Sequence, residues 1–533
     1  MAQRQPGPLA AGIEAGALNR IEAKQVSLNM KQILFSLLIF PLVVCAATKK
    51  QPNVILFLVD DMGLMDTSVP ALVDDQGNPR KHALNSWYRT PNMEKLAAKG
   101  IRFSQFYAHT VCSPTRVSIM TGQNSARHRT TQFISPNGKN TGDNGPEAWN
   151  WAGLDSKNVT LPRLLREAGY RTIHVGKAHF SPPGHEGENP LTLGFDVNVA
   201  GCSYGQPGSY FGQDGYGNLN PKRKKRAVPG LEKYHCTEIF LTEALTIEAK
   251  AEIDKSLELE KPFYLYMAHY AVHSPFQSDP RFAANYADSD KKKNGKAFAT
   301  LVEGIDKSLG DLMDHLDNRN VAENTLILFM GDNGTAAPIG RGDEIACSAP
   351  LRGKKASLWE GGTRVPFIAA WANPRSSHPL QKRLPIMAGG IQSRMGICYD
   401  VFPTLVKFAG AKTPDGHRVD GIDLSGLLSG KDEEAKREVF LSHFPHSYTS
   451  SYFTTYREGD WKLVYRYFPD QTKGQNRYAL YHLGRDPSES NDLSNQQPDQ
   501  VKRLTQTMIR SLDEMNALYP TVKGRALKPV IPN

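Results

Sequence analysis

Residues 52–63 read PNVILFLVDDMG, an uninterrupted apolar run from Val54 to Val59 that ends in Asp60 and Asp61. A continuous apolar run of this length is typical of a strand that is buried on both faces, as in a parallel sheet. Ligands of open parallel sheets bind beyond the carboxyl ends of the strands. The two aspartates are therefore expected at a functional edge of the sheet.

The same plan of a buried strand followed by polar residues recurs along the chain. Helix signals separate the strands, because Pro91 and Pro162 stand where a helix would begin and Gly100 and Gly169 where it would end. The polar residues expected at later strand ends are Lys177 and His179, His269 and His273, and Asp332 and Asn333. Alternating strands and helices predict a large, mixed but mainly parallel sheet sandwiched by helices, an α/β fold.

The pattern changes near residue 431. The segments REVFLSHF, YFTTYREGDWKLVYRY and YALYHLGRDP predict short aromatic strands, and a helix is expected from about Gln500 to Leu518. We therefore expect a main domain over residues 48–430 and a small C-terminal subdomain over 431–533, built of an antiparallel sheet and a helix.

The N-terminal region carries the pattern of a secretory signal peptide at residues 30–47. Lys31 precedes an apolar run over residues 33–44, and the small residues Ala46 and Ala47 follow. The apolar run is too short to span a bilayer comfortably, so no stable membrane insertion is expected. These features predict an exported protein, periplasmic or secreted. Residues 1–29 are interpreted as a non-native extension or a disordered arm.

The formal net charge of +10 is compatible with an anionic polymer as partner, or with nothing more than a basic surface. Two basic runs, 221–226 and 291–296, lie among Gly, Asn and Asp and are interpreted as solvated loops, with contact to an anionic ligand as the alternative. No zinc-finger spacing or RNA-binding aromatic motif accompanies them, which argues against nucleic acid as a partner.

Asp60, Asp61, Asp332 and Asn333 together predict a metal site. Each pair alone has a simpler interpretation, a helix cap for the first and a turn for the second. Taken together, adjacent carboxylates need a cation to offset their repulsion, and a third carboxylate with an amide oxygen completes a set of hard oxygen ligands. That chemistry favours Ca²⁺ or Mg²⁺ over zinc.

Several cationic or titratable residues also fall at predicted strand ends. Lys177, His179 and His273 could each be structural, but three such groups near a probable cation favour an anion site. Lys354 and Lys355 stand in a glycine-rich stretch whose simplest interpretation is a surface loop.

Cys112 opens a C-x-P-x-R pattern with Pro114 and Arg116. A free cysteine is most often a buried small apolar residue. Here the proline suits the first turn of a helix, and a helix N-terminus beside an arginine is suited to an anion.

The stretch CSPTRVSIMTG at residues 112–122 resembles the signature of the type I sulfatases, formylglycine-dependent members of the alkaline phosphatase superfamily. Residues 169–180 resemble the second signature of that family, and the segments at 331–334 and 351–366 match in order. The resemblance covers nearly the whole chain after the predicted signal peptide. It implies the superfamily's fold and a sulfuric ester hydrolase whose Cys112 is converted to formylglycine by a maturation enzyme.

The resemblance also implies a role for each site residue. Ca²⁺, in preference to Mg²⁺, would be bound by Asp60, Asp61, Cys112, Asp332 and Asn333. The catalytic residues would be Cys112, Arg116, Lys177, His179, His273 and Lys355. Arg116 would steady the formylglycine, Lys177 and His179 would contact its hydroxyls, and His273 and Lys355 would contact the sulfate.

In the implied chemistry, one hydroxyl of the hydrated aldehyde attacks sulfur while the other later expels sulfate. His273 would protonate the leaving alcohol, and His179 would accept the proton of the second hydroxyl. A sulfated polysaccharide or its oligosaccharides is the expected substrate. Two alternatives stay open: a phosphonate monoester or phosphodiester hydrolase of the same superfamily, and a decayed sulfatase that only binds sulfated glycans.

Overall fold

The structure, a computed structural model, describes residues 51–74, 76–339, 347–431 and 437–533. The predicted extension 1–29 and signal peptide 30–47 lie outside these residues. No helix in the described ranges is both long enough and apolar enough to cross a membrane.

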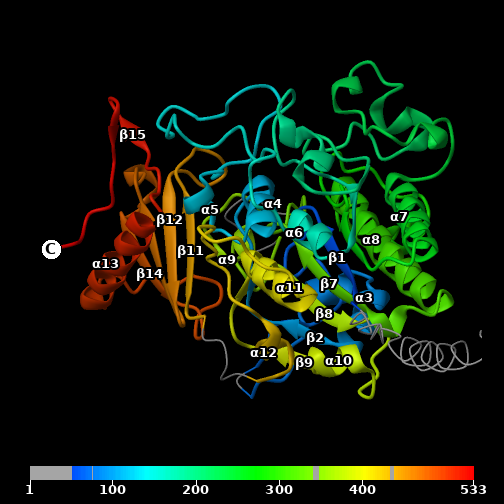
Figure 1. The fold of residues 1–533 in the computed structure, drawn as a ribbon. Coiled ribbons are helices and arrows are strands. Elements are labelled where there is room, and N and C mark those ends of the chain that lie inside the picture. Colours follow the sequence, from blue (N-terminus) through cyan, green and yellow to red (C-terminus); the bar gives the residue numbers. More distant parts are fainter. Residues whose placement is uncertain (1–50, 75, 340–346, 432–436) are drawn as a thin grey trace, which may run out of the picture. The chain divides into compact units, whose positions relative to one another are not determined.

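The core of the chain is an eight-stranded sheet with the order β5-β4-β6-β1-β7-β8-β2-β9 (Figure 1). The strands β5, β4, β6, β1 and β7 are parallel to one another, and β2 is parallel to β9, whereas β8 is antiparallel to both strands beside it. The bounds are β1 (Asn53–Val59), β2 (Ile101–Phe103), β4 (Arg171–Gly176), β5 (Val197–Val199), β6 (Phe263–Ala268), β7 (Thr325–Gly331), β8 (Phe367–Trp371) and β9 (Gly390–Gln392). The prediction of a mixed, mainly parallel sheet is confirmed.

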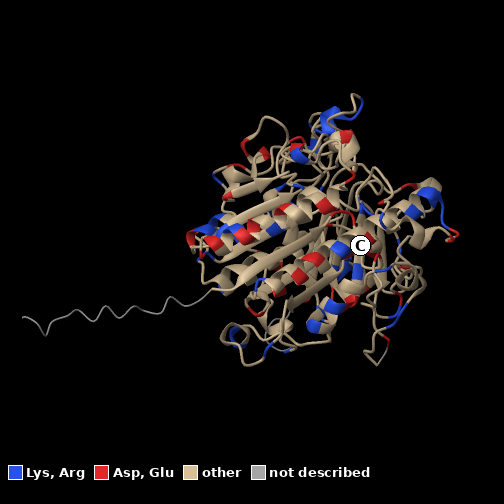
Figure 2. Ribbon diagram, turned by 90° about the vertical axis from the view of Figure 1, so that its right-hand side faces the viewer, with Lys and Arg blue, Asp and Glu red and all other residues tan. Residues whose placement is uncertain are grey.

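Helices cover both faces of this sheet. Because side chains alternate along a strand, Ile55 and Phe57 of β1 pack against one layer while Leu56 and Leu58 pack against the other. The first layer contains α3 (Pro91–Lys99), α7 (Leu241–Glu258) and α8 (Lys293–Asn318), and the second contains α4 (Cys112–Thr121), α6 (Leu161–Glu167) and α11 (Val401–Ala409). Figure 2 shows charged residues of both signs along the helices, while the strands carry almost none.

Two of the predicted helix starts are confirmed and one predicted loop is wrong. Pro91 and Pro162 lie in the first turns of α3 and α6. The basic run 291–296 was expected as a loop, but α8 begins at Lys293. Lysine is a good helix former, and the segment that follows has an apolar face that packs against the sheet, so the helix extends back into the basic run.

The C-terminal part forms a second, antiparallel sheet in the order β11-β12-β13-β14. Its strands are β11 (Val439–Phe444), β12 (Phe453–Glu458), β13 (Trp461–Arg466) and β14 (Tyr478–His482). One face packs against α13 (Pro498–Glu514), whose Leu504, Met508 and Leu512 join the core of this sheet (Figure 1). The expected antiparallel sheet with a helix is confirmed, and the boundary at 431 stays a prediction.

Shorter elements complete the fold. They are α2 (Ala83–Trp87), β3 (Phe106–Tyr107), α5 (Ser125–His128), α9 (Glu360–Thr363), α10 (Pro379–Arg383), β10 (Gly396–Ile397), α12 (Ser425–Leu428), β15 (Thr521–Val522) and β16 (Arg525–Ala526).

Candidate active site

The predicted site residues meet at one edge of the large sheet. The strands β4, β6, β1 and β7 are adjacent and parallel, so their carboxyl ends lie together. The side chains that follow them are Lys177 and His179 after β4, His273 after β6, Asp60 and Asp61 after β1, and Asp332 and Asn333 after β7. Cys112 and Arg116 from α4, together with Lys355 from the loop before α9, complete the cluster.

Three buried carboxylates form the centre of the site. Asp60, Asp61 and Asp332 offer ligand oxygens within 4.8 Å of one another. Each also has a cationic partner, since Lys177 Nζ lies 2.7 Å from Asp60 Oδ2 and Arg116 Nε donates to Asp332 Oδ2 over 2.9 Å. Side-chain cations therefore offset part of the repulsion among the carboxylates, in addition to what a metal would offset.

Two oxygen atoms of the cluster lack a hydrogen-bond partner among the described residues. Asp60 Oδ1 and Asn333 Oδ1 are buried and accept no hydrogen bond from any described residue. A buried polar atom without a partner is costly. Burial, outweighing Lys177, and the nearby charge of Asp332 raise the pKa of Asp60 well above its usual range. These observations fit a hard divalent cation held by carboxylate and amide oxygens.

Asp61 joins the ends of β1 and β7. Its backbone has φ 62°, in the left-handed region, and its N–H donates to Asp332 Oδ1 over 3.0 Å. Asn333 Nδ2 donates to Asp61 Oδ1 over 2.9 Å. Although burial acts to raise the pKa of Asp61, the positive charges around it, that of Lys355 first, outweigh burial and hold that pKa well below its usual range. Asp61 therefore stays ionised at neutral pH.

Cys112 is the first residue of α4 and faces His179. The Cys112 Sγ lies 3.4 Å from His179 Nδ1, and the other ring nitrogen, Nε2, lies 2.7 Å from the carbonyl oxygen of Ile134. When Nε2–H donates to Ile134, Nδ1 presents its lone pair to residue 112. Burial and the charge of Lys177 lower the pKa of His179 well below its usual range. The neutral tautomer can thus accept a proton from a group at position 112. Nothing in the sequence pointed to Ile134, because a backbone carbonyl leaves no residue-type signal.

His273 reaches the cluster and His269 does not. His273 Nε2 lies 3.5 Å from Asp61 Oδ2, and Nδ1 lies 3.0 Å from the carbonyl oxygen of Ser274. Burial and the charge of Lys355 lower the pKa of His273 to about 3. His269 Nε2 instead lies 2.9 Å from Ser308 Oγ on α8, so this histidine is a buried structural residue.

The structure distinguishes between the two adjacent lysines. Lys355 Nζ lies 2.6 Å from Asp61 Oδ1, whereas Lys354 Nζ donates to the carbonyl oxygen of Ala337 over 3.3 Å. The N–H of Lys355 donates to the carbonyl oxygen of Thr335 over 2.8 Å, which ties its loop to the segment after β7. The simpler interpretation of this stretch as a surface loop is wrong for Lys355.

Comparison with known proteins supports one family. The family model described as sulfatase matches residues 52–411. N-acetylgalactosamine-6-sulfatase of Mus musculus is 29% identical over 503 residues, covering 87% of this chain and 86% of that protein. A sulfatase of Formosa agariphila is 27% identical, covering 88% and 90%. The crystal structure of Ps i-CgsB in complex with k-i-k-neocarrahexaose has a TM-score of 0.67 and 26% identity, covering 87% of this chain and 93% of that one.

Proposed function

This chain belongs to the sulfatase family and hydrolyses sulfate esters, and we propose that it does so with a formylglycine at position 112 and one divalent cation. The observation that carries this proposal is the buried cluster itself. It gathers three carboxylates, an amide oxygen, three cations and two histidines around the N-terminus of α4. A cluster of this composition suits an anionic sulfate group held beside a cation.

The cation is proposed to be Ca²⁺ rather than Mg²⁺. Its ligands would be Asp60, Asp61, Asp332, Asn333 and the modified residue 112. The partnerless oxygens of Asp60 and Asn333 support this assignment. When bound, the cation supplies Lewis-acid chemistry, lowering the pKa of a hydroxyl that it holds and withdrawing charge from the sulfate.

The formylglycine is proposed because Cys112 stands in the C-x-P-x-R pattern. Hydrated, that residue would supply a first hydroxyl for attack on sulfur and a second for release of sulfate. Arg116 would steady residue 112 from one helical turn away, because its guanidinium is fixed by Asp332 and by the carbonyl oxygen of Lys177, 2.7 Å from Nη1.

The surrounding side chains would move protons and hold charge. His179 would accept a proton through Nδ1, which faces position 112. Lys177 and Lys355 would contact sulfate oxygens and offset the charge of the transition state. His273 would protonate the leaving alcohol, because the negative charge of a bound sulfate ester favours the protonated imidazole and raises its pKa.

We further propose a sulfated polysaccharide or its oligosaccharides as substrate. The relative from mouse is named for N-acetylgalactosamine 6-sulfate, and the solved neighbour Ps i-CgsB is described in complex with k-i-k-neocarrahexaose. We propose that the protein is exported, either to the periplasm or out of the cell, where such polymers are met. Its catalytic domain would span residues 48–430 and its C-terminal subdomain residues 431–533. A formylglycine-generating enzyme would be its maturation partner.

The test is sulfate release from nitrophenyl sulfate and from sulfated sugars, measured against phosphodiester and phosphonate monoester hydrolysis. We expect the sulfate esters to be turned over with the higher kcat/KM. A preference for phosphodiesters would favour the rival hydrolase. Binding of sulfated sugars without release of sulfate would indicate the decayed alternative, which the complete set of catalytic residues argues against.

A further inference from the structure

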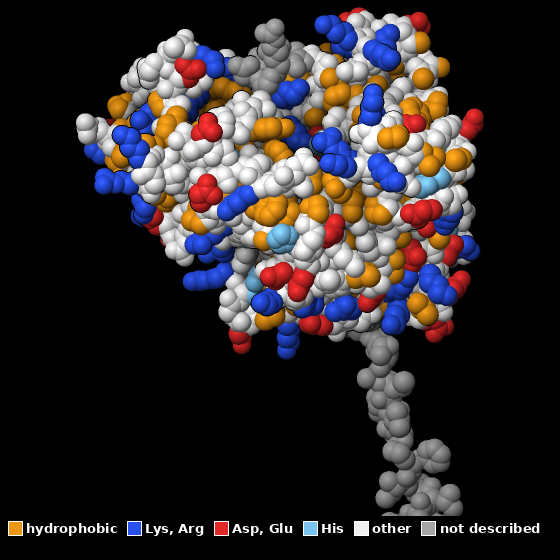
Figure 3. All heavy atoms as spheres, turned by 90° about the horizontal axis from the view of Figure 1, so that it is seen from above, with side chains coloured by type: hydrophobic (Ala, Val, Ile, Leu, Met, Phe, Trp, Pro, Cys, Tyr) orange, Lys and Arg blue, Asp and Glu red, His pale blue; other side chains and the backbone are white. Residues whose placement is uncertain are grey.

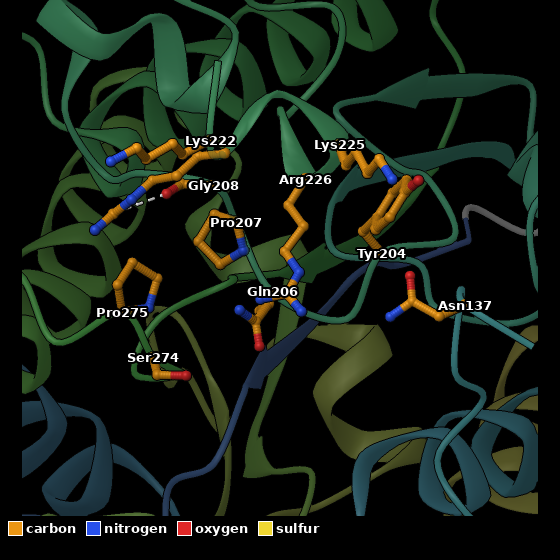
Figure 4. Close-up of a pocket in the computed structure, with 11 residues that line it drawn as sticks. Asn137, Tyr204, Gln206, Pro207, Gly208, Lys222, Lys225, Arg226, Ser274 and Pro275 are labelled. Carbon is orange, nitrogen blue, oxygen red and sulfur yellow. Dashed lines mark hydrogen bonds between the residues drawn. The ribbon is translucent and has the colours of Figure 1, made fainter. Parts of the chain in front are cut away.

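A pocket of about 480 Å³ carries the basic run 222–226 on its wall (Figure 4). Four cationic side chains line it: Lys222, Arg223, Lys225 and Arg226. The lining includes no Asp or Glu. The volume falls in the range of about 300–1,000 Å³ that is typical of small-ligand sites. The pocket is thus a positively charged hollow of ligand size.

Two residues that line this pocket are close in the chain to the two histidines of the candidate active site or to their contacts. Ser274 lines it and follows His273 directly, so their Cα atoms are about 3.8 Å apart. On another wall, Tyr204 precedes Gly205, which packs against the His179 ring so closely that a Cβ at position 205 would lie 2.4 Å from a ring carbon. The segments that line the pocket are thus the ones that hold or contact both histidines, which puts the pocket next to the candidate active site.

Backbone contacts fix the basic run on the pocket wall. The N–H of Gly208 donates to the carbonyl oxygen of Arg226 over 2.6 Å, and Arg223 Nη1 donates to the carbonyl oxygen of Gly208 over 3.0 Å. A Cβ at position 208 would lie 2.9 Å from the carbonyl oxygen of Arg223, so glycine is required for this approach. The cationic side chains are thereby presented from an anchored segment.

The positive charge of the run is not neutralised by the part of the chain that the structure describes. Within it, no carboxylate lies within 4.0 Å of the four cationic groups. Lys222, Lys225 and Arg226 are exposed, and Figure 4 shows Arg226 reaching toward the interior of the pocket. The face seen in Figure 3 carries Lys and Arg side chains around a central hollow. Clustered like charges without counter-charges favour an anionic ligand.

We propose that this pocket binds a second anionic group, sulfate or carboxylate, of an oligosaccharide whose reacting sulfate ester occupies the active site. This inference rests on the proposed function and narrows the substrate to multiply charged saccharides. The planar guanidinium of Arg226 suits two-point contact with such an anion, and the ring of Tyr204 offers a flat apolar face to a sugar. The basic run would thus select saccharides that carry a second anionic group besides the sulfate ester that is hydrolysed.

The experiment compares N-acetylgalactosamine 6-sulfate with its 4,6-disulfate, and adds a singly sulfated disaccharide that carries a uronate. In the Lys225→Ala/Arg226→Ala variant, we expect KM for the doubly charged sugars to rise about tenfold or more, with kcat retained. Turnover of nitrophenyl sulfate stays unchanged, because it has no second charge. Comparing the disulfate with the uronate distinguishes sulfate from carboxylate as the preferred anion.

The matched control is Lys293→Ala/Lys296→Ala, which removes two cations that line a different pocket. Equal losses in both double variants would indicate general attraction and overturn the proposal. Calorimetric measurement of the binding of the same sugars tests the anion-binding pocket separately from the proposed catalytic mechanism. A wild-type preference for the doubly charged sugar, lost in the Lys225/Arg226 variant, supports the pocket even if no sulfate is released. Absence of that preference in the wild-type protein refutes it, even if nitrophenyl sulfate is cleaved.

Discussion

Lys355 and Asp61 come from distant parts of the sequence and form a 2.6 Å ion pair at the carboxyl edge of the large sheet. The charge of Asp61 outweighs the effect of burial and raises the pKa of Lys355 above its usual range, so the ammonium stays protonated. A fixed positive charge beside the acidic cluster is suited to hold an anion during reaction.

Replacing this lysine tests that role. Lys355→Ala should lower kcat on nitrophenyl sulfate by about 10²–10³, the loss typical of removing one donor from a developing negative charge. The matched control is Lys354→Ala, because Lys354 points to the carbonyl oxygen of Ala337 instead. Comparable losses in the two variants, measured by initial rates, would contradict the assignment.

Removal of the metal should abolish activity and lower thermal stability together. A chelator would leave the buried oxygens of Asp60 and Asn333 without a partner. When the free metal concentration is 100 times the Kd, binding adds about 2.7 kcal/mol to the free energy of unfolding, and chelation removes that contribution. Calcium should restore both properties more fully than magnesium. Asp60→Asn should weaken calcium binding in calorimetry, whereas Asp279→Asn, a buried aspartate paired with Arg281, should not. Full activity of the stripped protein would refute the metal site.

The sequence predicted the parts of the site that residue type reveals. Buried runs such as 54–59 end in polar residues, and parallel strands bring those ends together, which was enough to group Asp60 with Asp332. Residue type alone could not separate Lys354 from Lys355, and it was the resemblance to the sulfatases that assigned the role to Lys355; the contacts of the two side chains differ through the fold of their loop, in which the N–H of Lys355 donates to the carbonyl oxygen of Thr335. The sequence also missed the contacts that the C-terminal sheet makes with α9, since these depend on packing rather than on local pattern.

Lys462 is the clearest of those missed contacts. It lies on β13, buried, with Nζ 3.0 Å from Glu360 Oε1 and 2.7 Å from Glu489 Oε1. Lys462→Met should remove the cation that the two buried carboxylates share, leaving Glu360 with Arg364 at 3.6 Å, and should lower the free energy of unfolding by about 3–5 kcal/mol in urea titrations. Lys473→Met, on the exposed surface beside Asp470, is the control and should change it by less than about 1 kcal/mol. A small effect at Lys462 would indicate that the two glutamates share a proton instead.

A buried aspartate outside the metal cluster should make stability depend on pH. Burial, only partly offset by hydrogen bonds from Thr335 and from the N–H of Gly63, raises the pKa of Asp66 to about 7. The folded state therefore favours the protonated form. The contribution of protonated Asp66 to the free energy of unfolding is complete below the pKa of about 4 that the residue has in the unfolded chain. It is lost as the pH rises to about 7, by at most about 1.4 kcal/mol per pH unit.

Asp66→Asn tests this dependence, because an amide keeps the neutral form at every pH. Urea titrations at pH 5 and pH 7.5 should show a smaller decline in unfolding free energy for the variant than for the native protein. Asp155→Asn, an exposed position, should leave the native decline unchanged. Parallel declines in the native protein and Asp66→Asn would place the titrating group elsewhere.

The last prediction concerns Cys112. Mass spectrometry of the peptide spanning residues 109–127 from the active protein should find formylglycine at position 112, while the buried Cys398, which lies outside any C-x-P-x-R pattern, should remain a thiol.

Cys112→Ala should be inactive. Cys112→Ser should be able to accept sulfate at most once, because its single hydroxyl can attack sulfur but leaves none to expel the product. A sulfated serine would then accumulate without turnover. Since His179 Nδ1 lies 3.4 Å from the position of the nucleophile, His179→Ala should slow release of sulfate when residue 112 is unchanged. A fully active preparation with an unmodified thiol at position 112 would overturn this mechanism, because a thiol lacks the second hydroxyl that the release step requires.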